Sequence, residues 1–253
     1  MKAKFFYVFL FLLFGLNATA QKTGVQLYNT GAPTNASLRG MSIPTDEVIW
    51  VSGSNGTVGR STDAGKSWVW QCVKGYESKD FRDIHAFDSN TAIIMAVGDP
   101  GILLKTKNGG KTWNVVFQKS LPGMFLDAMD FRNDKEGICI GDPLNIGESG
   151  RKFFYTIRTK DGGETWEQDP LYKMTPAERN GEAVFAASGT NIVMLNNHPD
   201  LDYVFVSGGM VSNIYFIAKE ERKIKPTKQA SIKVQNLLEF SPLLMMAKKI
   251  FFV

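Results

Sequence analysis

The chain has 253 residues, and a composition of 43% apolar and 12% aromatic residues excludes a disordered protein. Its formal net charge of +4 is uneven, because residues 1–20 carry +2, residues 219–253 carry +5 and residues 21–218 carry −3. A globular nucleic-acid binder should carry its positive charge on the folded domain, so this distribution argues against that class.

The first twenty residues are predicted to be a secretory signal peptide. Lys2 and Lys4 precede an apolar run from Phe5 to Leu16, and Ala18-Thr19-Ala20 forms a small-residue cleavage site. A run of about twelve apolar residues is too short to span a bilayer comfortably, although a retained anchor is the alternative. We expect an exported protein, periplasmic or extracellular, with no membrane span after cleavage.

The body of the chain repeats itself. Three segments share the pattern Ser/Thr-x-Asp/Asn-x-Gly-x-Ser/Thr-Trp and end at Trp68, Trp113 and Trp166. Short β-branched and aromatic runs bounded by Gly, Pro, Asn and Asp precede each segment and are typical of strands. Four strands in about 45 residues, repeated, indicate a β-propeller.

We therefore predict an all-β fold, a β-propeller of four-stranded blades with about four blades present in residues 21–218. The repeat units are expected near 38–72, 81–118, 125–169 and 180–218. The last unit has no Trp segment, and its strands are expected at 180–185, 191–195, 203–209 and 212–218.

The repeated segment resembles the Asp-box, also called the bacterial neuraminidase repeat, which marks a hairpin turn. The Asp or Asn accepts bonds from nearby backbone N–H groups, the glycine supplies φ > 0, and the Trp packs between neighbouring blades. All nine such residues are therefore predicted to be structural. They are Asp63, Gly65 and Trp68 in the first box, Asn108, Gly110 and Trp113 in the second, and Asp161, Gly163 and Trp166 in the third.

Other polar features have plain interpretations. Gly98-Asp99-Pro100 and Gly141-Asp142-Pro143 recur in two units and are predicted turns between the second and third strands. The polar insertion 145–151 is a candidate partner-contact loop. Cys72 and Cys139 are predicted to be free and buried, with a disulfide as the alternative. His85 and His198 are predicted to be structural or solvated, and no metal site is expected.

Residues 53–68 and 81–86 resemble exported propellers related to the photosystem II assembly and stability factor, whose bacterial relatives often carry a loose oxidoreductase label. The resemblance implies a seven-bladed propeller that acts as a non-catalytic binding scaffold or assembly factor, with a protein partner in the cell envelope. No nucleotide fingerprint, haem motif or paired redox cysteine supports an oxidoreductase, so no cofactor is expected. The alternative is a glycoside hydrolase of sialidase-like or xyloglucanase-like type, since those enzymes also carry Asp-boxes.

The resemblance also implies where a site would lie, because the first strand of each propeller blade lines the central channel. The matching charged residues are Arg39, Arg82, Asp83, Asp127 and Glu182. Arginines at a channel rim could hold a carboxylate or phosphate, whereas a mixed-charge ring that satisfies itself is the alternative. A hydrolase would need two of these carboxylates about 5–9.5 Å apart.

Residues 219–253 do not continue the repeat. They are highly charged at first and then lack Gly, Trp and any box from 235 to 253. Seven blades of ~45 residues would need a much longer chain, so we expect a truncated or frame-shifted member whose tail is out of frame or disordered. A closed four-bladed propeller is the alternative.

Overall fold

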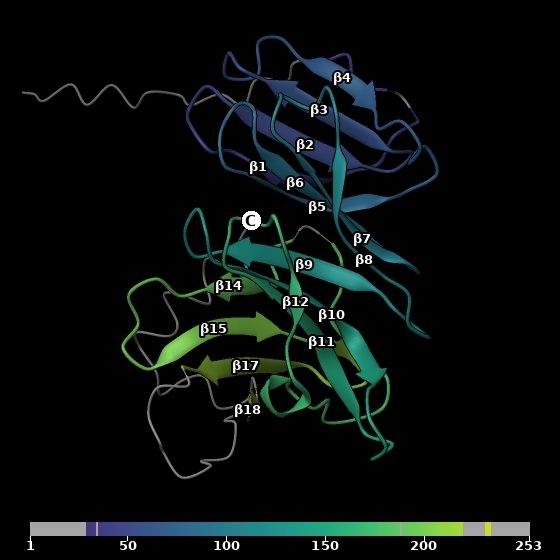
Figure 1. Ribbon diagram of the computed structural model, residues 1–253, viewed down its shortest axis with the longest axis vertical. Coiled ribbons are helices and arrows are strands. Elements are labelled where there is room, and N and C mark those ends of the chain that lie inside the picture. The colour runs from purple at the N-terminus through teal and green to yellow at the C-terminus, as the bar shows by residue number, and fades with distance from the viewer. Residues whose placement is uncertain (1–28, 34, 188, 220–230, 234–253) are drawn as a thin grey trace, which may run out of the picture.

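The structure is a computed structural model that describes residues 29–33, 35–187, 189–219 and 231–233 (Figure 1). The predicted signal peptide lies outside these ranges, as does most of the predicted tail. In chain order the elements are β1 (Leu38–Ser42), β2 (Ile49–Gly53), β3 (Thr57–Ser61), β4 (Val69–Cys72), β5 (Phe81–Ala86), β6 (Ala92–Ala96), β7 (Gly101–Thr106), β8 (Asn114–Lys119), β9 (Leu126–Phe131), β10 (Gly137–Asn145), β11 (Lys152–Thr159), β12 (Glu167–Gln168), the 3-10 helix η1 (Leu171–Lys173), β13 (Glu182–Ala183), β14 (Ile192–Met194), β15 (Leu201–Val206), β16 (Gly208–Gly209), β17 (Asn213–Ala218) and β18 (Ser231–Lys233).

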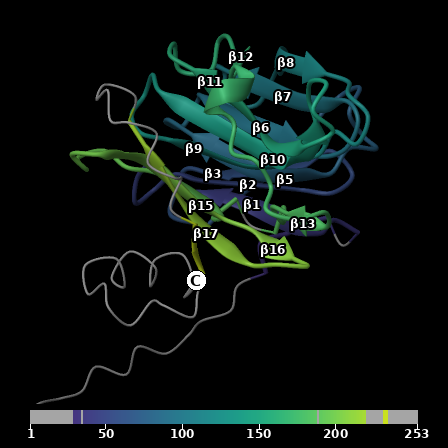
Figure 2. The same cartoon turned by 90° about the horizontal axis from the view of Figure 1, so that it is seen from below.

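The strands form four antiparallel four-stranded sheets that follow one another along the chain, and we call them the first to fourth blades. Their strand orders are β1-β2-β3-β4, β5-β6-β7-β8, β9-β10-β11-β12 and β14-β15-β17-β18. The innermost strands β1, β5, β9 and β14 contact one another in sequence. In Figures 1 and 2 the blades lie one after another in the order in which they occur along the chain. The predicted all-β partial propeller is confirmed.

The strand assignment predicted for the fourth unit was wrong by one strand. Its innermost strand is β14, not the segment near 180–185, which forms β13 and pairs with β16 in a separate two-stranded ribbon. The outermost strand is β18, which pairs with β17 and lies within the predicted tail. Glu182 explains the difference, because its buried side chain bonds the side chains of Ser207, Asn213 and Tyr215 and fixes the ribbon against β17.

The two Gly-Asp-Pro segments have different structures. Gly98-Asp99-Pro100 connects β6 and β7 as predicted. Gly141-Asp142-Pro143 lies inside β10. The register shifts between Gly141 and Pro143 in the pairing with β11, and between Ile140 and Gly141 in the pairing with β9. The predicted turn is thus a β-bulge, since β10 and β11 continue pairing as far as Asn145 and Lys152. A bulge re-aims side chains and bends its strand.

The three boxes share one hydrogen-bond pattern in the turn between the third and fourth strands of a blade. In the first box, the Ser67 backbone N–H donates to Asp63 at 2.8 Å and the Gly65 backbone N–H donates to Ser61 at 2.9 Å. The second and third boxes repeat both bonds. Hydrogen bonds from the Ser67 side chain and backbone, with a further one from Ser61, lower the pKa of Asp63 to about 2.

The box tryptophans lie between blades where a preceding blade exists. Trp113 of the second blade packs edge-on against Trp50 of the first blade, with ring centroids 6.3 Å apart. Trp166 of the third blade is buried in a cluster that includes Ile93 of the second blade. Trp68 of the first blade stacks instead on Trp70 of its own blade at 5.3 Å and is only half-buried. The interblade packing predicted for the Trp thus holds for two of the three boxes.

Polar side chains join the innermost strands of successive blades. The Ala86 backbone N–H donates to Ser42 Oγ at 3.0 Å between the first and second blades. The Met129 N–H donates to Asp83 at 2.7 Å at the next junction, and the Met194 N–H donates to Asp130 at 2.6 Å at the last. Burial raises the pKa of Asp83 to about 7 and also raises the pKa of Asp130.

Among the described residues, no helix has the length and apolar character needed to cross a membrane. The apolar residues are gathered instead between the blades, in one cluster for each pair of neighbouring blades.

We predict that Trp166→Ala lowers the free energy of unfolding by about 3–5 kcal/mol, because the substitution empties a packed site between two blades. Trp68→Ala is the matched control and should cost clearly less, since its ring is half-exposed on its own blade. Urea unfolding followed by circular dichroism measures both. Equal losses of unfolding free energy in the two variants would show that a Trp between blades stabilises the fold no more than one on its own blade.

We predict that the protein is more stable at pH 5 than at pH 8. A carboxyl whose pKa is raised in the folded state binds more protons when folded, so its contribution is lost as pH rises from the unfolded pKa to the folded one. For Asp83 that window runs from 3.8 to about 7. Asp83→Asn should have a lower free energy of unfolding than the unmutated protein at pH 5. Between pH 5 and pH 8, its free energy of unfolding should fall by about 2 kcal/mol less than that of the unmutated protein. An unchanged pH dependence in urea unfolding of Asp83→Asn would contradict this assignment.

Candidate functional site

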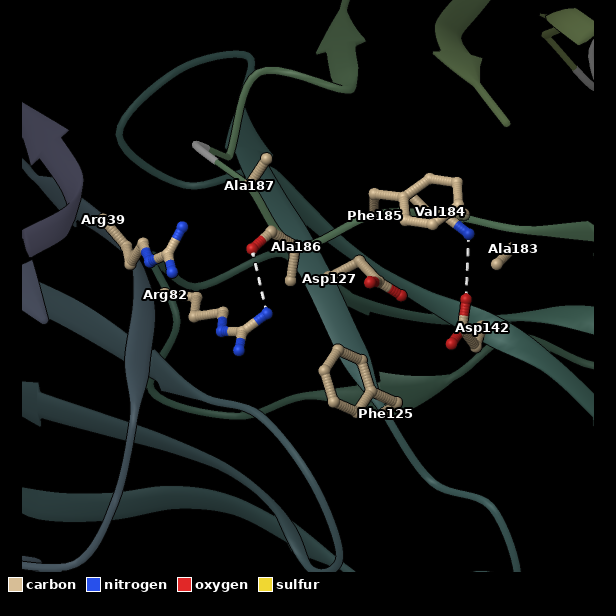
Figure 3. Close-up of a pocket in the computed structure, with 10 residues that line it drawn as sticks. All are labelled: Arg39, Arg82, Phe125, Asp127, Asp142, Ala183, Val184, Phe185, Ala186 and Ala187. Carbon is tan, nitrogen blue, oxygen red and sulfur yellow. Dashed lines mark hydrogen bonds between the residues drawn. The ribbon is translucent and has the colours of Figure 1, made fainter. Parts of the chain in front are cut away.

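A pocket of about 350 Å³ lies where the inner strands of the first three blades meet the segment 183–187 (Figure 3). Arg39 comes from β1, Arg82 from β5, Asp127 from β9 and Asp142 from the bulge in β10. The sequence placed Arg39, Arg82 and Asp127 together at the inner strands, and the structure brings all three to this pocket.

Arg82 is held in place at one end of the pocket. Its Nε donates to Asp80 at 2.8 Å, its Nη1 donates to the carbonyl oxygen of Ala186 at 3.4 Å, and its guanidinium lies over the Phe125 ring at 5.8 Å. Such contacts fix the plane of a guanidinium, and a planar fork of donors matches a carboxylate. Arg82 remains 31% exposed, so it can still donate to a ligand.

Arg39 lies next to Arg82 in the pocket and is exposed. Within the described part of the chain, its guanidinium has neither a hydrogen bond nor an ion pair. Its charge is therefore available to a bound anion.

Asp127 lies deeper in the pocket and is 1% exposed. Burial, with the nearby Asp142 carboxylate, raises the pKa of Asp127 to about 9, while a backbone hydrogen bond from Ala186 opposes the shift. The carboxyl is therefore protonated at neutral pH. Its Oδ2 atom is buried and has no hydrogen-bond partner among the described residues, which is a costly arrangement in a folded protein.

Asp142 is half-buried beside Asp127 and accepts the backbone N–H of Val184 at 2.8 Å (Figure 3). Burial raises its pKa, whereas the hydrogen bond from Val184 and the charge of Lys152 lower it. The bond to Val184 draws the segment 183–187 over the pocket.

The other two predicted rim residues lie outside the pocket. Asp83 is buried at the junction of the second and third blades, where it accepts the backbone N–H groups of Ile84 and Met129. Glu182 is buried in the ribbon, where it accepts bonds from Tyr215 Oη at 2.7 Å and Asn213 Nδ2 at 3.0 Å. Both carboxyl groups are occupied by contacts that hold the fold together.

Among the pocket residues that sequence reasoning missed, Phe125, Asp142 and Phe185 have the aromatic or charged side chains. Asp142 sits in the recurring Gly-Asp-Pro segment, which was interpreted as a turn, and the longer third unit was the signal that it could be a bulge instead. Phe125 immediately precedes a predicted inner strand. Phe185 had no signal, because its position depends on the unexpected path of the segment after β13.

The cysteines and histidines lie outside the pocket. Cys72 and Cys139 are free, as predicted, but Cys72 is exposed and its predicted burial was wrong, since it lies in the short outer strand of the first blade. His85 stacks on Phe131 at 4.4 Å, and burial lowers its pKa to about 4. His198 Nδ1 accepts the Leu201 N–H at 2.9 Å in a turn.

Comparison with known proteins connects these repeats to one family. Residues 23–138 match the family model described as photosynthesis system II assembly factor YCF48. The chain is 31% identical over 86 residues to the chloroplastic photosystem II stability/assembly factor HCF136 of Oryza sativa subsp. japonica, a match that covers 32% of this chain and 18% of that protein.

Two solved structures are also similar. A structure of YCF48 bound to D1 peptide is 22% identical, with a TM-score of 0.47, over 79% of this chain and 53% of that one. The GH74 xyloglucanase from Xanthomonas campestris is 12% identical, with a TM-score of 0.43, over 73% of this chain and 27% of that one. This chain thus spans about half the length of the YCF48 structure and a smaller part of the others. The resemblance predicted from the sequence is confirmed by the family match: the chain is an Asp-box β-propeller protein similar to the photosystem II assembly factor family.

Proposed function

We propose that the protein is a non-catalytic binding scaffold that is exported to the cell envelope and holds an acidic segment of a partner protein at the pocket of Arg39 and Arg82. The observation that carries this proposal is the pair of adjacent guanidinium groups, one fixed by Asp80 and Phe125 and the other unengaged. Two such groups bind a carboxylate with both charge and geometry. The family's name, that of an assembly factor, supports a role in protein binding.

The surroundings of the pocket favour a peptide over a small ion. Phe185, which follows β13, is 56% exposed at the pocket, and Met210, which follows β16, is 77% exposed. The Phe185 ring lies over Gly208 and the Met210 side chain lies over Gly181, so both are supported by β13, β16 and their flanks. Exposed apolar side chains beside a charged pocket suit a partner that offers apolar and charged groups together.

The carboxyl groups favour binding over glycoside hydrolysis. A hydrolase needs one free carboxylate and one carboxylic acid facing a substrate. Asp83 and Glu182 are engaged by backbone and side-chain donors within the fold, and they lie outside the pocket. Asp127 and Asp142 share the pocket, but Asp127 is 1% exposed and Asp142 is engaged by the backbone N–H of Val184.

We predict that a photo-crosslinking amino acid placed at Phe185 in the full chain captures a specific envelope protein in the native cell. Arg82→Gln should reduce the capture at least about tenfold, because loss of a charge-assisted pair costs about 1.5–3 kcal/mol. Lys119→Gln, at the exposed end of the outer strand β8, is the matched control and should leave the capture unchanged. Quantitative mass spectrometry measures both. No captured protein, or equal capture by both variants, would refute the proposal.

We predict that the mature protein begins at Gln21 and is recovered from the envelope fraction, because residues 1–20 have the order of a signal peptide. N-terminal mass spectrometry after fractionation measures this. A cytoplasmic protein that retains Met1 would contradict the export part of the proposal and would leave the binding part to the crosslinking test.

A further inference from the structure

The pocket has two ends of opposite character. Figure 3 shows the guanidinium groups of Arg39 and Arg82 on one side and the carboxyl groups of Asp127 and Asp142 on the other, with Ala186 between them. Arg82 is paired with Asp80 and not with either pocket acid. Among the ion pairs of the described residues, none joins the two ends of the pocket directly.

The acid end is incomplete without a ligand. Asp127 is almost fully buried, yet its Oδ2 has no hydrogen-bond partner among the described residues. Buried polar atoms are nearly always paired, so an unpaired one in a pocket points to a missing partner. Asp142 stands beside it with one oxygen engaged by Val184, and it is the less buried of the two.

We propose that the pocket binds a dipolar peptide segment, whose carboxylate pairs with Arg39 and Arg82 and whose lysine ammonium pairs with Asp142 and Asp127. This inference rests on the proposed function, because it names the kind of partner segment that the same pocket selects. An ammonium group offers three donors, enough for Asp142 and for the unpaired oxygen behind it. The exposed Phe185 ring provides an apolar surface for the lysine stem.

The charged groups around the acid end fit this assignment. Asp142 on β10 raises the pKa of Asp127, and Arg82 on β5 lowers it. Lys152 on β11 lowers the pKa of Asp142. The segment 183–187 contributes apolar side chains and backbone groups. Among the ion pairs of the described residues, none joins Lys152 to Asp142.

Binding of the ammonium is coupled to release of a proton. In the free protein the Asp127 carboxyl keeps its proton at neutral pH, because burial and Asp142 raise its pKa to about 9. A bound ammonium stabilises the ionised carboxylate, so the proton leaves Asp127 for the solvent while the ligand keeps its own charge. The affinity for the dipolar segment should therefore rise as pH increases from 6 to 9.

The test uses fluorescein-labelled Gly/Ser peptides that contain one Glu and one Lys, separated by one, two or three glycines. Each has two matched counterparts, one with acetyl-lysine in place of Lys and one with Gln in place of Glu. Fluorescence anisotropy with the full protein should show the best-spaced dipolar peptide binding about tenfold more tightly than its acetyl-lysine counterpart. Calorimetry at pH 7.5 in buffers of different ionisation enthalpy should show release of up to about one proton.

Three variants locate the effect. Asp142→Asn should abolish the advantage of Lys over acetyl-lysine and keep the preference for Glu over Gln, since an amide oxygen still accepts the Val184 N–H. Asp127→Asn should remove the proton release. Asp46→Asn, an exposed acid in the loop between β1 and β2, is the matched control and should change neither readout.

Equal binding of the lysine and acetyl-lysine peptides would overturn the dipolar site, as would no binding of any peptide in the set. A retained preference for Glu over Gln in that case would still support the arginine end. The proposed function itself stands or falls on capture of a partner through Phe185, so the two failures are distinguishable.

Discussion

The arrangement of the blades depends on how the free edge of each innermost strand is satisfied. β5, β9 and β14 each lie at the end of a sheet, so half of their backbone N–H groups have no strand partner on that side. Such groups are costly when buried. The preceding blade supplies the acceptor through Ser42, Asp83 and Asp130 in turn. One side chain per junction thus sets the distance and register between neighbouring blades.

A second repeated contact acts on the outer side of the same junctions. The residue just before the hydroxyl of each box is basic, and its side chain reaches the following blade. Arg60 donates to the carbonyl of Ser89, and Lys105 donates to the carbonyl of Gly162 at 2.8 Å in the next box. Arg158 has no following box, and it pairs instead with Asp202 of the fourth blade at 2.9 Å. The missing fourth box is therefore replaced by an ion pair whose arginine lies in the usual place.

The sequence predicted the parts of the fold that local chemistry determines. Box turns, strand runs and unit spacing depend on Gly, Asp and Trp within a few residues of one another, so the first three blades matched the structure. The fourth unit did not, because Glu182 is a polar residue whose role depends on Tyr215, more than thirty positions later. Only some of the pocket residues were predicted, because the others depend on contacts between segments far apart in the sequence. Arg39, Arg82 and Asp127 follow from the repeat, whereas Asp142 depends on a bulge and Phe185 on the path of β13.

Asp83 and Asp127 occupy corresponding positions in successive repeat units, yet they differ in one respect that links fold and site. Asp83 uses both carboxyl oxygens, one for Ile84 and one for Met129, because a regular inner strand follows in the next blade. Asp127 faces the segment 183–187, which is diverted into the ribbon of β13 and β16, and its Oδ2 is left unpaired. Asp130 holds the junction with β14 in the third unit, so Asp127, which corresponds to Asp83, is left without a donor from a following inner strand. The site therefore arises where the repeat is broken, since an acceptor built to hold a blade is there left free for a ligand.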